Sequence, residues 1–204
     1  MIADFIGLLT IFPLLLISVS IHEFSHGWVA YKLGDPTAKY SGRLTLNPLA
    51  HIDPVGTIIL PLMLFFASQG KFVFGAAKPI PVNFNLLRNP KRDIIWVGAS
   101  GPAANFIFAF ILSLILKIAP LNDFLSIITL KLILINVILG VFNLIPIPPL
   151  DGSRIAIGLM PKNIAYQYSK IEPYGFIIVI LLIYLGIFNH IIFPVVRIIL
   201  QWLK

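Results

Sequence analysis

Long apolar runs, separated by short polar loops, make up most of the chain. The runs cover about residues 5–33, 94–118, 124–145, 174–188 and 191–203. A helix needs about 20 mostly apolar residues to cross the hydrocarbon core of a membrane. The pattern therefore predicts an all-α, polytopic membrane protein with about five full transmembrane helices. Asn189 and His190 alone separate the last two runs, so we expect these two to form a tight hairpin.

The segment between the first and second full spans is apolar but short. Residues 55–68 would form about 21 Å of helix, which is less than the thickness of the hydrocarbon core. Residues 70–85 follow, and Pro79 and Pro81 favour an extended strand or polyproline conformation there. We expect a short re-entrant helix followed by an extended strand or hairpin. An ordinary full span is the alternative, and it would invert the topology of everything after it.

Composition narrows the class of protein. The chain has 204 residues, of which 58% are hydrophobic and 11% charged, a balance outside the range of soluble domains. The net charge of +7 comes from basic residues scattered through short loops, with no basic patch that would indicate a nucleic-acid partner. The chain has no cysteine, so a transition-metal site would have to use imidazole and carboxylate ligands.

The positions of the basic residues predict the orientation in the membrane. Eleven of the fifteen Lys and Arg residues lie in loops 32–53, 70–92 and 147–171. Cytoplasmic loops are enriched in basic residues, so these three loops are expected on the cytoplasmic side. Residues 54–69 would then lie between two cytoplasmic loops, which favours the re-entrant interpretation.

An H-E-x-x-H motif lies within the first apolar run, at residues 22–26. Residues four apart share one face of a helix, so His22 and His26 can offer two imidazole nitrogens to one metal ion. Glu23 lies at the edge of that face, where it can reach a water molecule and act as a general base. Chance, or two structural core histidines, would explain the motif without a metal. Both explanations are weakened because ionisable groups within a membrane are costly and usually functional.

The motif is also placed deep in its helix. His22 lies eleven residues before Leu33, the last residue of the apolar run. At a rise of 1.5 Å per residue this is about 16 Å from the helix end. A metal bound there would lie within the bilayer.

A second motif, residues 143–152, lies where prolines end the third full span. A catalytic zinc takes three protein ligands and keeps one position open, and Asp151 is the only carboxylate between Asp123 and Glu172. Gly152 can adopt backbone conformations that would let Asp151 turn into a cavity. A lone Asp-Gly pair is otherwise typical of a turn.

Two asparagines lie inside apolar runs. Asn105 and Asn143 could each form a simple helix–helix hydrogen bond. Their occurrence together makes a shared polar cavity the more plausible interpretation.

Together these residues resemble the site-2 protease family of intramembrane zinc metalloproteases. The resemblance rests on His22-Glu23-x-x-His26 and on Asn143-x-x-Pro146-x-Pro148-x-Leu150-Asp151-Gly152. It extends over about residues 6–158 and fits a compact form without PDZ or CBS modules. The resemblance implies a single intramembrane metalloprotease domain over residues 1–204, with a catalytic core at about 1–160 and a C-terminal transmembrane hairpin at about 172–204.

The resemblance also implies a site and an activity. His22, His26 and Asp151 would bind one zinc ion, and Glu23 would activate water. Asn143, and with it Asn105, would hold the substrate peptide. The expected reaction is hydrolysis of peptide bonds within or near transmembrane segments of membrane-protein substrates, as in regulated intramembrane proteolysis. The expected location is a prokaryotic cell membrane, with lipid around the protein and the active site towards the cytoplasmic side.

Alternatives remain open from the sequence. A metal-ion transporter, channel or binding protein would also place His and Asp residues in the membrane. A conduction path usually needs polar residues along several spans, and residues 106–116 and 176–188 are nearly all apolar. An inactive relative is less favoured because Glu23 is present. Residues 78–83 could accept an unwound substrate by strand addition or act as a structural plug.

Overall fold

The computed structural model describes residues 2–70 and 75–203. Within these residues every regular element is a helix and there is no strand. The three longest helices are α1 (Ile2–Lys32), α4 (Pro90–Ile118) and α5 (Asp123–Asn143). Each contains a stretch long and apolar enough to cross a membrane. The prediction of an all-α, multi-pass membrane protein is therefore confirmed, whereas the predicted number of about five full spans is not.

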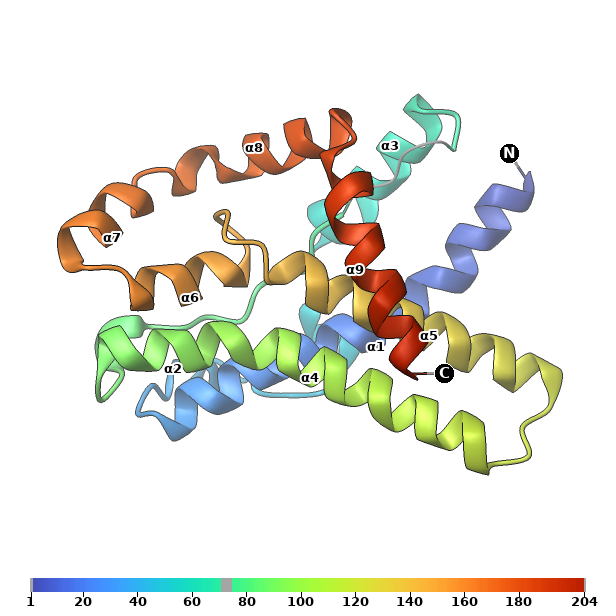
Figure 1. Cartoon of the computed structure of the whole chain (residues 1–204), viewed down its shortest axis with the longest axis horizontal. Helices are drawn as coiled ribbons and strands as arrows, with labels where there is room; N and C mark the ends of the chain where they lie inside the picture. Colours follow the sequence, from blue (N-terminus) through green and yellow to red (C-terminus); the bar gives the residue numbers. More distant parts are fainter. Residues whose placement is uncertain (1, 71–74, 204) are drawn as a thin grey trace.

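Helix α4 runs along the lower side of the molecule in the view of Figure 1. It packs against α1, α5 and α6 (Asp151–Leu159), and α5 also packs against α1 and α9 (Ile187–Leu203). The largest apolar cluster joins α4, α5 and α9; its buried members are Ala109, Leu112, Ile133, Val137, Ile192 and Val196. The contact between α1 and α4 positions the site described below, because the two histidines lie on α1 and their hydrogen-bond partners lie on α4.

Short helices fill the segment between α1 and α4. These are α2 (Thr37–Tyr40), the 3-10 helix η1 (Pro48–His51), the π-helix η2 (Pro54–Ile59), α3 (Leu60–Ala67) and the 3-10 helix η3 (Phe84–Leu86). The Asp53 carboxylate starts η2 by accepting from two free amides of its first turn. The expected short apolar helix is thus present as η2 and α3.

The expected strand after this helix is absent from the described residues. Residues 75–83, called the strap below, have no regular secondary structure and pair with no neighbouring strand. The Ala76 amide donates to the Gly56 carbonyl at 2.9 Å, and the Lys78 amide donates to the His51 carbonyl at 3.0 Å. Pro79 and Pro81 have no amide hydrogen, which removes two donors from any strand ladder. Residues 71–74, part of the same expectation, lie outside the described residues.

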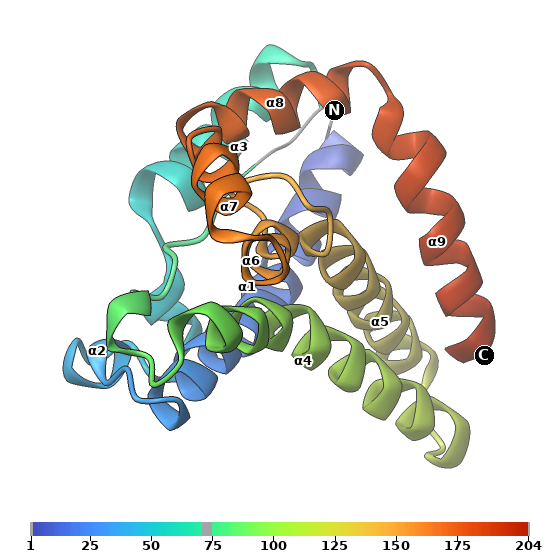
Figure 2. The ribbon, with the colours of Figure 1, turned by 60° about the vertical axis from the view of Figure 1, so that its left-hand side comes forward.

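The C-terminal part consists of α7 (Lys162–Ser169), α8 (Glu172–Tyr184) and α9. Helices α8 and α9 meet at a bend of 82°. Figure 2 shows the chain changing direction between them, and the expected tight hairpin is not confirmed. The break lies at Gly186, whose φ of +70° suits a residue without a side chain. Asn189 and His190, where the turn was expected, lie inside α9.

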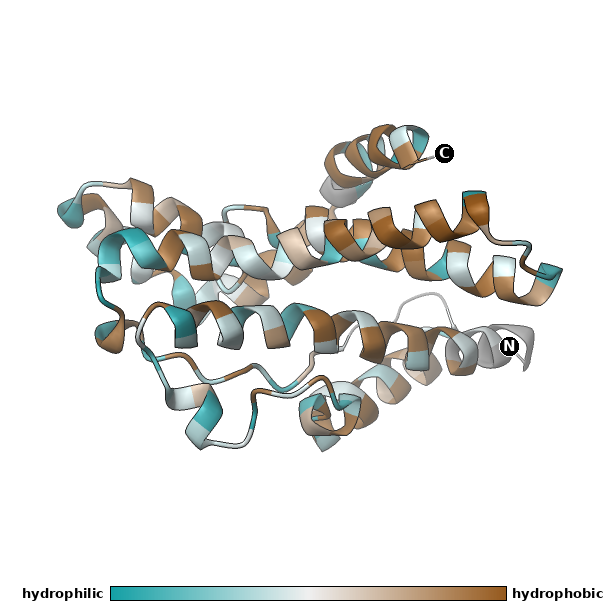
Figure 3. Cartoon of the chain, turned by 90° about the horizontal axis from the view of Figure 1, so that it is seen from below, coloured by the Kyte–Doolittle hydropathy of each residue, from teal (hydrophilic) through white to brown (hydrophobic). Residues whose placement is uncertain are grey.

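Apolar and polar residues separate along the long direction of the molecule. In Figure 3 polar residues gather at the end where α4 begins and α7 lies, while apolar residues cover the helices towards the other end. Three of the described helices are long and apolar enough to cross a membrane, and the bent pair α8–α9 would be a fourth if it is one span. The arrangement is that of a multi-pass membrane protein with one polar, loop-rich end.

Candidate metal centre and catalytic pocket

Three side chains from two helices meet at one point. His22 and His26 lie one turn apart on α1, and Asp151 is the first residue of α6. The two Nε2 atoms are 3.1 Å apart, and the Asp151 Oδ2 lies 3.0 Å from that of His22 and 3.2 Å from that of His26. Both histidines are buried. The structure therefore brings the three predicted ligands together.

The other ring nitrogens determine how the two imidazoles are oriented. His22 Nδ1 lies 2.6 Å from the Asn105 Oδ1, and His26 Nδ1 lies 2.7 Å from the Val97 carbonyl. Both partners are acceptors, so each Nδ1 carries the hydrogen in a neutral imidazole. Each Nε2 then has a free lone pair that faces the cluster, as metal-binding histidines require.

The cluster fits a metal ion. Two Nε2 lone pairs and a carboxylate oxygen face one another with no hydrogen between them, and the buried Asp151 Oδ2 has no hydrogen-bond donor among the described residues. A bound cation would neutralise the buried carboxylate and accept the three lone pairs. Ligands at about 2.0–2.1 Å from a tetrahedral zinc ion are about 3.4 Å apart, close to the separations found here.

Gly101 on α4 makes room for the two histidines. A Cβ atom at this position would lie 2.4 Å from the His26 Nε2 and 2.7 Å from the His22 Nε2. These distances are shorter than any real contact, so a side chain would displace the imidazoles. The small residue thus lets α4 approach α1 closely at the cluster.

Gly152 positions Asp151 for a reason that differs from the expected one. It lies inside α6 with a helical backbone, so the expectation of an unusual backbone conformation is wrong. A Cβ atom there would lie 2.2 Å from the Leu144 carbonyl oxygen. Glycine is needed for close approach: it lets the start of α6 pack onto the end of α5 and directs Asp151 towards the histidines.

Glu23 lies in the same pocket as the cluster. This pocket has a volume of about 320 Å³; its lining includes His22, Glu23, His26, Ile80, Asn143, Asp151 and Arg154. The Ile80 amide of the strap donates to the Glu23 Oε2 at 2.7 Å. One carboxylate oxygen is therefore held by the main chain, and Oε1 has no such bond to Ile80.

The two asparagines occupy different environments. Asn143 lines the pocket, with its Nδ2 donating to the Leu139 carbonyl at 3.0 Å. Asn105 is completely buried and does not line the pocket. Its Nδ2 donates to the Asn136 Oδ1 at 2.7 Å while its Oδ1 faces His22. The expected contact between Asn105 and a peptide is thus not supported, because other protein groups surround its amide.

Three features of this region were not predicted from the sequence. Asn136 and Ser18 complete the buried network, with the Asn136 Nδ2 donating to the Ser18 Oγ at 2.9 Å. Arg154 reaches the pocket wall from α6 and pairs with Glu172 through Nη1 at 3.1 Å. The contact of the Ile80 amide with Glu23 is made by the main chain, so no residue type in the sequence indicates it. The spacing of Arg154, three residues after Asp151, could have placed it on the same side of α6.

Comparison with known proteins gives the family. The closely aligned relatives include "Putative zinc metalloprotease YwhC" of Bacillus subtilis, which is 38% identical over 196 residues, covering 90% of this chain and 84% of the relative. The chain belongs to peptidase family M50, the site-2 proteases. Residues 121–186 match the family described as "Peptidase family M50". This part contains Asn143 and Asp151, while the H-E-x-x-H motif lies before it.

Two more distant relatives of this site-2 protease carry similar names. "Putative zinc metalloprotease Rip2" of Mycolicibacterium smegmatis is 28% identical over 183 residues, covering 89% of this chain and 69% of the relative. "Zinc metalloprotease MJ0392" of Methanocaldococcus jannaschii is 27% identical over 159 residues, covering 78% of this chain and 37% of the relative. No solved structure matches the chain. The family and the His–His–Asp cluster together indicate zinc as the metal.

The hydrogen bond between Asn105 and His22 leads to a prediction. Replacing Asn105 with Leu would leave the His22 Nδ1–H buried without an acceptor. Zinc affinity is expected to fall by about 10–100-fold, as for other groups that orient a metal ligand. Competition with a chelator measures it. Ser113→Ala on the same helix is the matched control, because its hydroxyl donates to the Leu203 carbonyl far from the site. Equal affinities for both variants would contradict the orienting role.

Proposed function

We propose that this site-2 protease is a zinc-dependent endopeptidase that hydrolyses peptide bonds within or near transmembrane segments of membrane-protein substrates. The observation that carries the proposal is the position of Glu23 in one pocket with His22, His26 and Asp151. A metal transporter needs only the ligands, whereas a carboxylate beside them and not among them serves water activation. We assign His22, His26 and Asp151 as the metal ligands and Glu23 as the general base.

Each residue has a chemical role in this proposal. When bound, zinc lowers the pKa of a water molecule and polarises the scissile carbonyl. Glu23 removes a proton from the attacking water through Oε1, while Ile80 holds Oε2. It then delivers that proton to the amine nitrogen as the C–N bond breaks, giving a new carboxylate and a new amine. Asn143 contacts the substrate peptide from the pocket wall, and Asn105 orients His22.

A prediction follows for Ile80. Ile80→Pro removes the amide that holds Glu23, in a segment that already has proline on both sides. The carboxylate then loses its fixed position, so kcat is expected to fall by about 10–100-fold, with KM nearly unchanged. Ile80→Val, which keeps the amide, is the control and should retain activity. Unchanged or higher turnover of Ile80→Pro, at equal zinc content, would contradict this role, because the hydrogen bond from Ile80 to Glu23 would then not assist catalysis.

We also propose an orientation and a topology. Helices α1, α4 and α5 cross the membrane, η2 and α3 enter and leave on one side, and α8 and α9 complete the spans as a separate C-terminal unit. The basic residues in its loops support a cytoplasmic position for the polar end, in a prokaryotic cell membrane, with the active site towards that side.

Cysteine labelling tests this orientation, since the chain has no cysteine of its own. Single cysteines at the exposed positions Tyr40, Arg88 and Lys162 should react from the cytoplasmic side, and one at Asn122 from the opposite side. A membrane-impermeant maleimide labels only outward-facing cysteines on whole cells, and it labels cysteines on both sides in lysed cells. Labelling of position 88 from outside would overturn the re-entrant topology.

The proposed activity itself is tested with purified protein. Protein loaded with one equivalent of zinc should cleave a transmembrane peptide in detergent, and chelator should stop the cleavage. The same protein in vesicles should not carry zinc across the bilayer. Zinc flux without peptide cleavage would instead support the transporter.

A further inference from the structure

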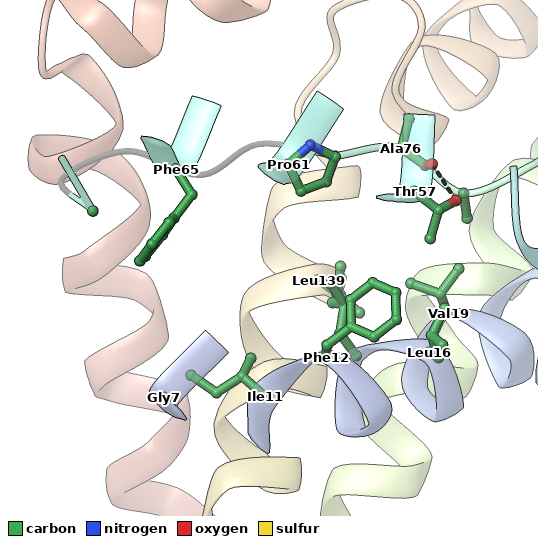
Figure 4. A pocket seen from close by; sticks show the side chains of 14 residues that line it. Gly7, Ile11, Phe12, Leu16, Val19, Thr57, Pro61, Phe65, Ala76 and Leu139 are labelled. Carbon is green, nitrogen blue, oxygen red and sulfur yellow. Dashed lines mark hydrogen bonds between the residues drawn. The ribbon is translucent and has the colours of Figure 1, made fainter. Parts of the chain in front are cut away.

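A second, larger cavity lies next to the catalytic pocket. It has a volume of about 640 Å³ and lies between the N-terminal half of α1, the helical segment η2–α3 and the start of the strap. Figure 4 shows Pro61 and Phe65 on one side of the gap and Ile11, Phe12, Leu16 and Val19 of α1 on the other. We call this cavity the outer groove.

The outer groove is continuous with the catalytic pocket along two walls. On α1, Phe12, Leu16 and Val19 line the groove, and Glu23 and His26 continue the same stripe in the pocket, at alternating steps of four and three residues. The strap forms the second wall: residues 75–77 line the groove, whereas Pro79, Ile80 and Val82 line the pocket. A chain that follows the groove therefore arrives at Glu23.

The two cavities differ in polarity. Among the described residues that line the outer groove, Thr57 has the one polar side chain, and its hydroxyl already donates to the Ala76 carbonyl at 2.8 Å. An unwound peptide would leave its amides and carbonyls without hydrogen-bond partners there, which is unfavourable in an apolar environment. A helix satisfies these groups internally. The pocket, by contrast, offers charged and amide side chains from Glu23, Asn143 and Arg154.

We propose that the outer groove binds the still-helical, apolar half of a transmembrane substrate, while the adjoining half unwinds in the catalytic pocket. This inference rests on the proposed proteolytic function. The helix-to-coil boundary of the substrate then lies between Val19 and Glu23. The groove lies on the N-terminal side of the site, so the substrate half that stays helical is the one away from the cytoplasm.

Gly7 allows this groove to be filled without disturbing the protein. It lines the groove, and a Cβ atom placed on it would meet nothing within 4 Å. Gly7→Phe should therefore occupy the space while leaving zinc binding intact. Ile17→Phe is the matched control, because Ile17 lies on an exposed side of α1 and does not line the groove.

The experiment compares two substrates with the same cut sequence. One has a full apolar transmembrane segment, and in the other a short polar tail replaces the apolar half on the far side from the cytoplasm. Gly7→Phe should cleave the full substrate about 10-fold more slowly than wild type and the truncated one at the wild-type rate; Ile17→Phe should cleave both normally. Equal losses of cleavage rate on both substrates, or no loss on either, would contradict substrate binding in the outer groove. Wild-type protein that cleaves neither would overturn the proposed function itself.

Cross-linking provides a readout that does not depend on activity. In the Glu23→Gln background, a single cysteine at position 11 should form disulfides with single cysteines on the apolar half of the full substrate, recurring every three to four residues. A cysteine at position 17 should form none. Absence of this pattern, in protein that binds the substrate, would assign the groove to lipid.

Discussion

Replacing His22, His26 or Asp151 with Ala is expected to reduce bound zinc from one per chain to well below one. Each variant removes one of three atoms that lie within 3.2 Å of one another and face a common centre. Loss of an orienting group already weakens metal binding by about 10–100-fold, so loss of a ligand should weaken it by about 100-fold or more. Activity should disappear together with the metal. Metal analysis of purified variants after dialysis against trace zinc measures the effect.

Asp151 is the decisive ligand, since it comes from another helix and lies 125 positions after His26 in the printed sequence. Glu172→Ala is a suitable control, because it removes a carboxylate from the Arg154 ion pair and leaves the cluster intact. Full zinc content and full activity in Asp151→Ala would show that the third ligand is a different group. Loss of zinc in Glu172→Ala alone would point to the same conclusion.

Glu23→Gln is expected to keep its zinc and lose proteolysis. The amide is nearly the same size as the carboxylate but cannot take a proton from water. General acid–base catalysis contributes about 10²–10⁴-fold, so turnover should fall by that factor. Cleavage of a transmembrane peptide and zinc content are measured on the same preparation.

Ser25 provides the control for this substitution. It lies between Glu23 and His26, and its hydroxyl donates to the Ile21 carbonyl at 2.8 Å within α1. Ser25→Ala should retain zinc and activity. Comparable turnover of Glu23→Gln and wild type would remove Glu23 from the chemistry, whereas simultaneous loss of zinc would identify it as a ligand.

The sequence allowed a large part of the site to be predicted because its spacing is local. His22 and His26 lie four residues apart, and helix geometry alone places them on one face. Asp151 could be proposed because it was the only carboxylate in its stretch. The Ile80 amide and the Val97 carbonyl could not be predicted, because every residue except proline has the same main-chain groups. Their partners depend on how the strap and α4 pack against α1.

The same limits apply to the fold. Apolar length predicted the three long helices and the short η2–α3 segment correctly, since each follows from local composition. The strand was wrong, because whether an extended segment forms a ladder depends on a neighbouring strand. The 82° bend at Gly186 was also missed: a glycine in an apolar run does not reveal which direction the chain takes. The resemblance implied that Asn105 holds the substrate. Its contacts with His22 and Asn136 could not be predicted, because these two residues lie on other helices.

The position of the cut tests the central claim most directly. Zinc-loaded protein is incubated with a peptide that carries one transmembrane segment and polar flanks, and mass spectrometry identifies the ends of the products. His22 lies about three turns from the end of α1, so the cut should fall inside the apolar segment, in its cytoplasmic third. It should be absent in Glu23→Gln and faster when Gly or Pro weakens the substrate helix near the cut. Products that end only in the polar flanks would contradict an intramembrane protease.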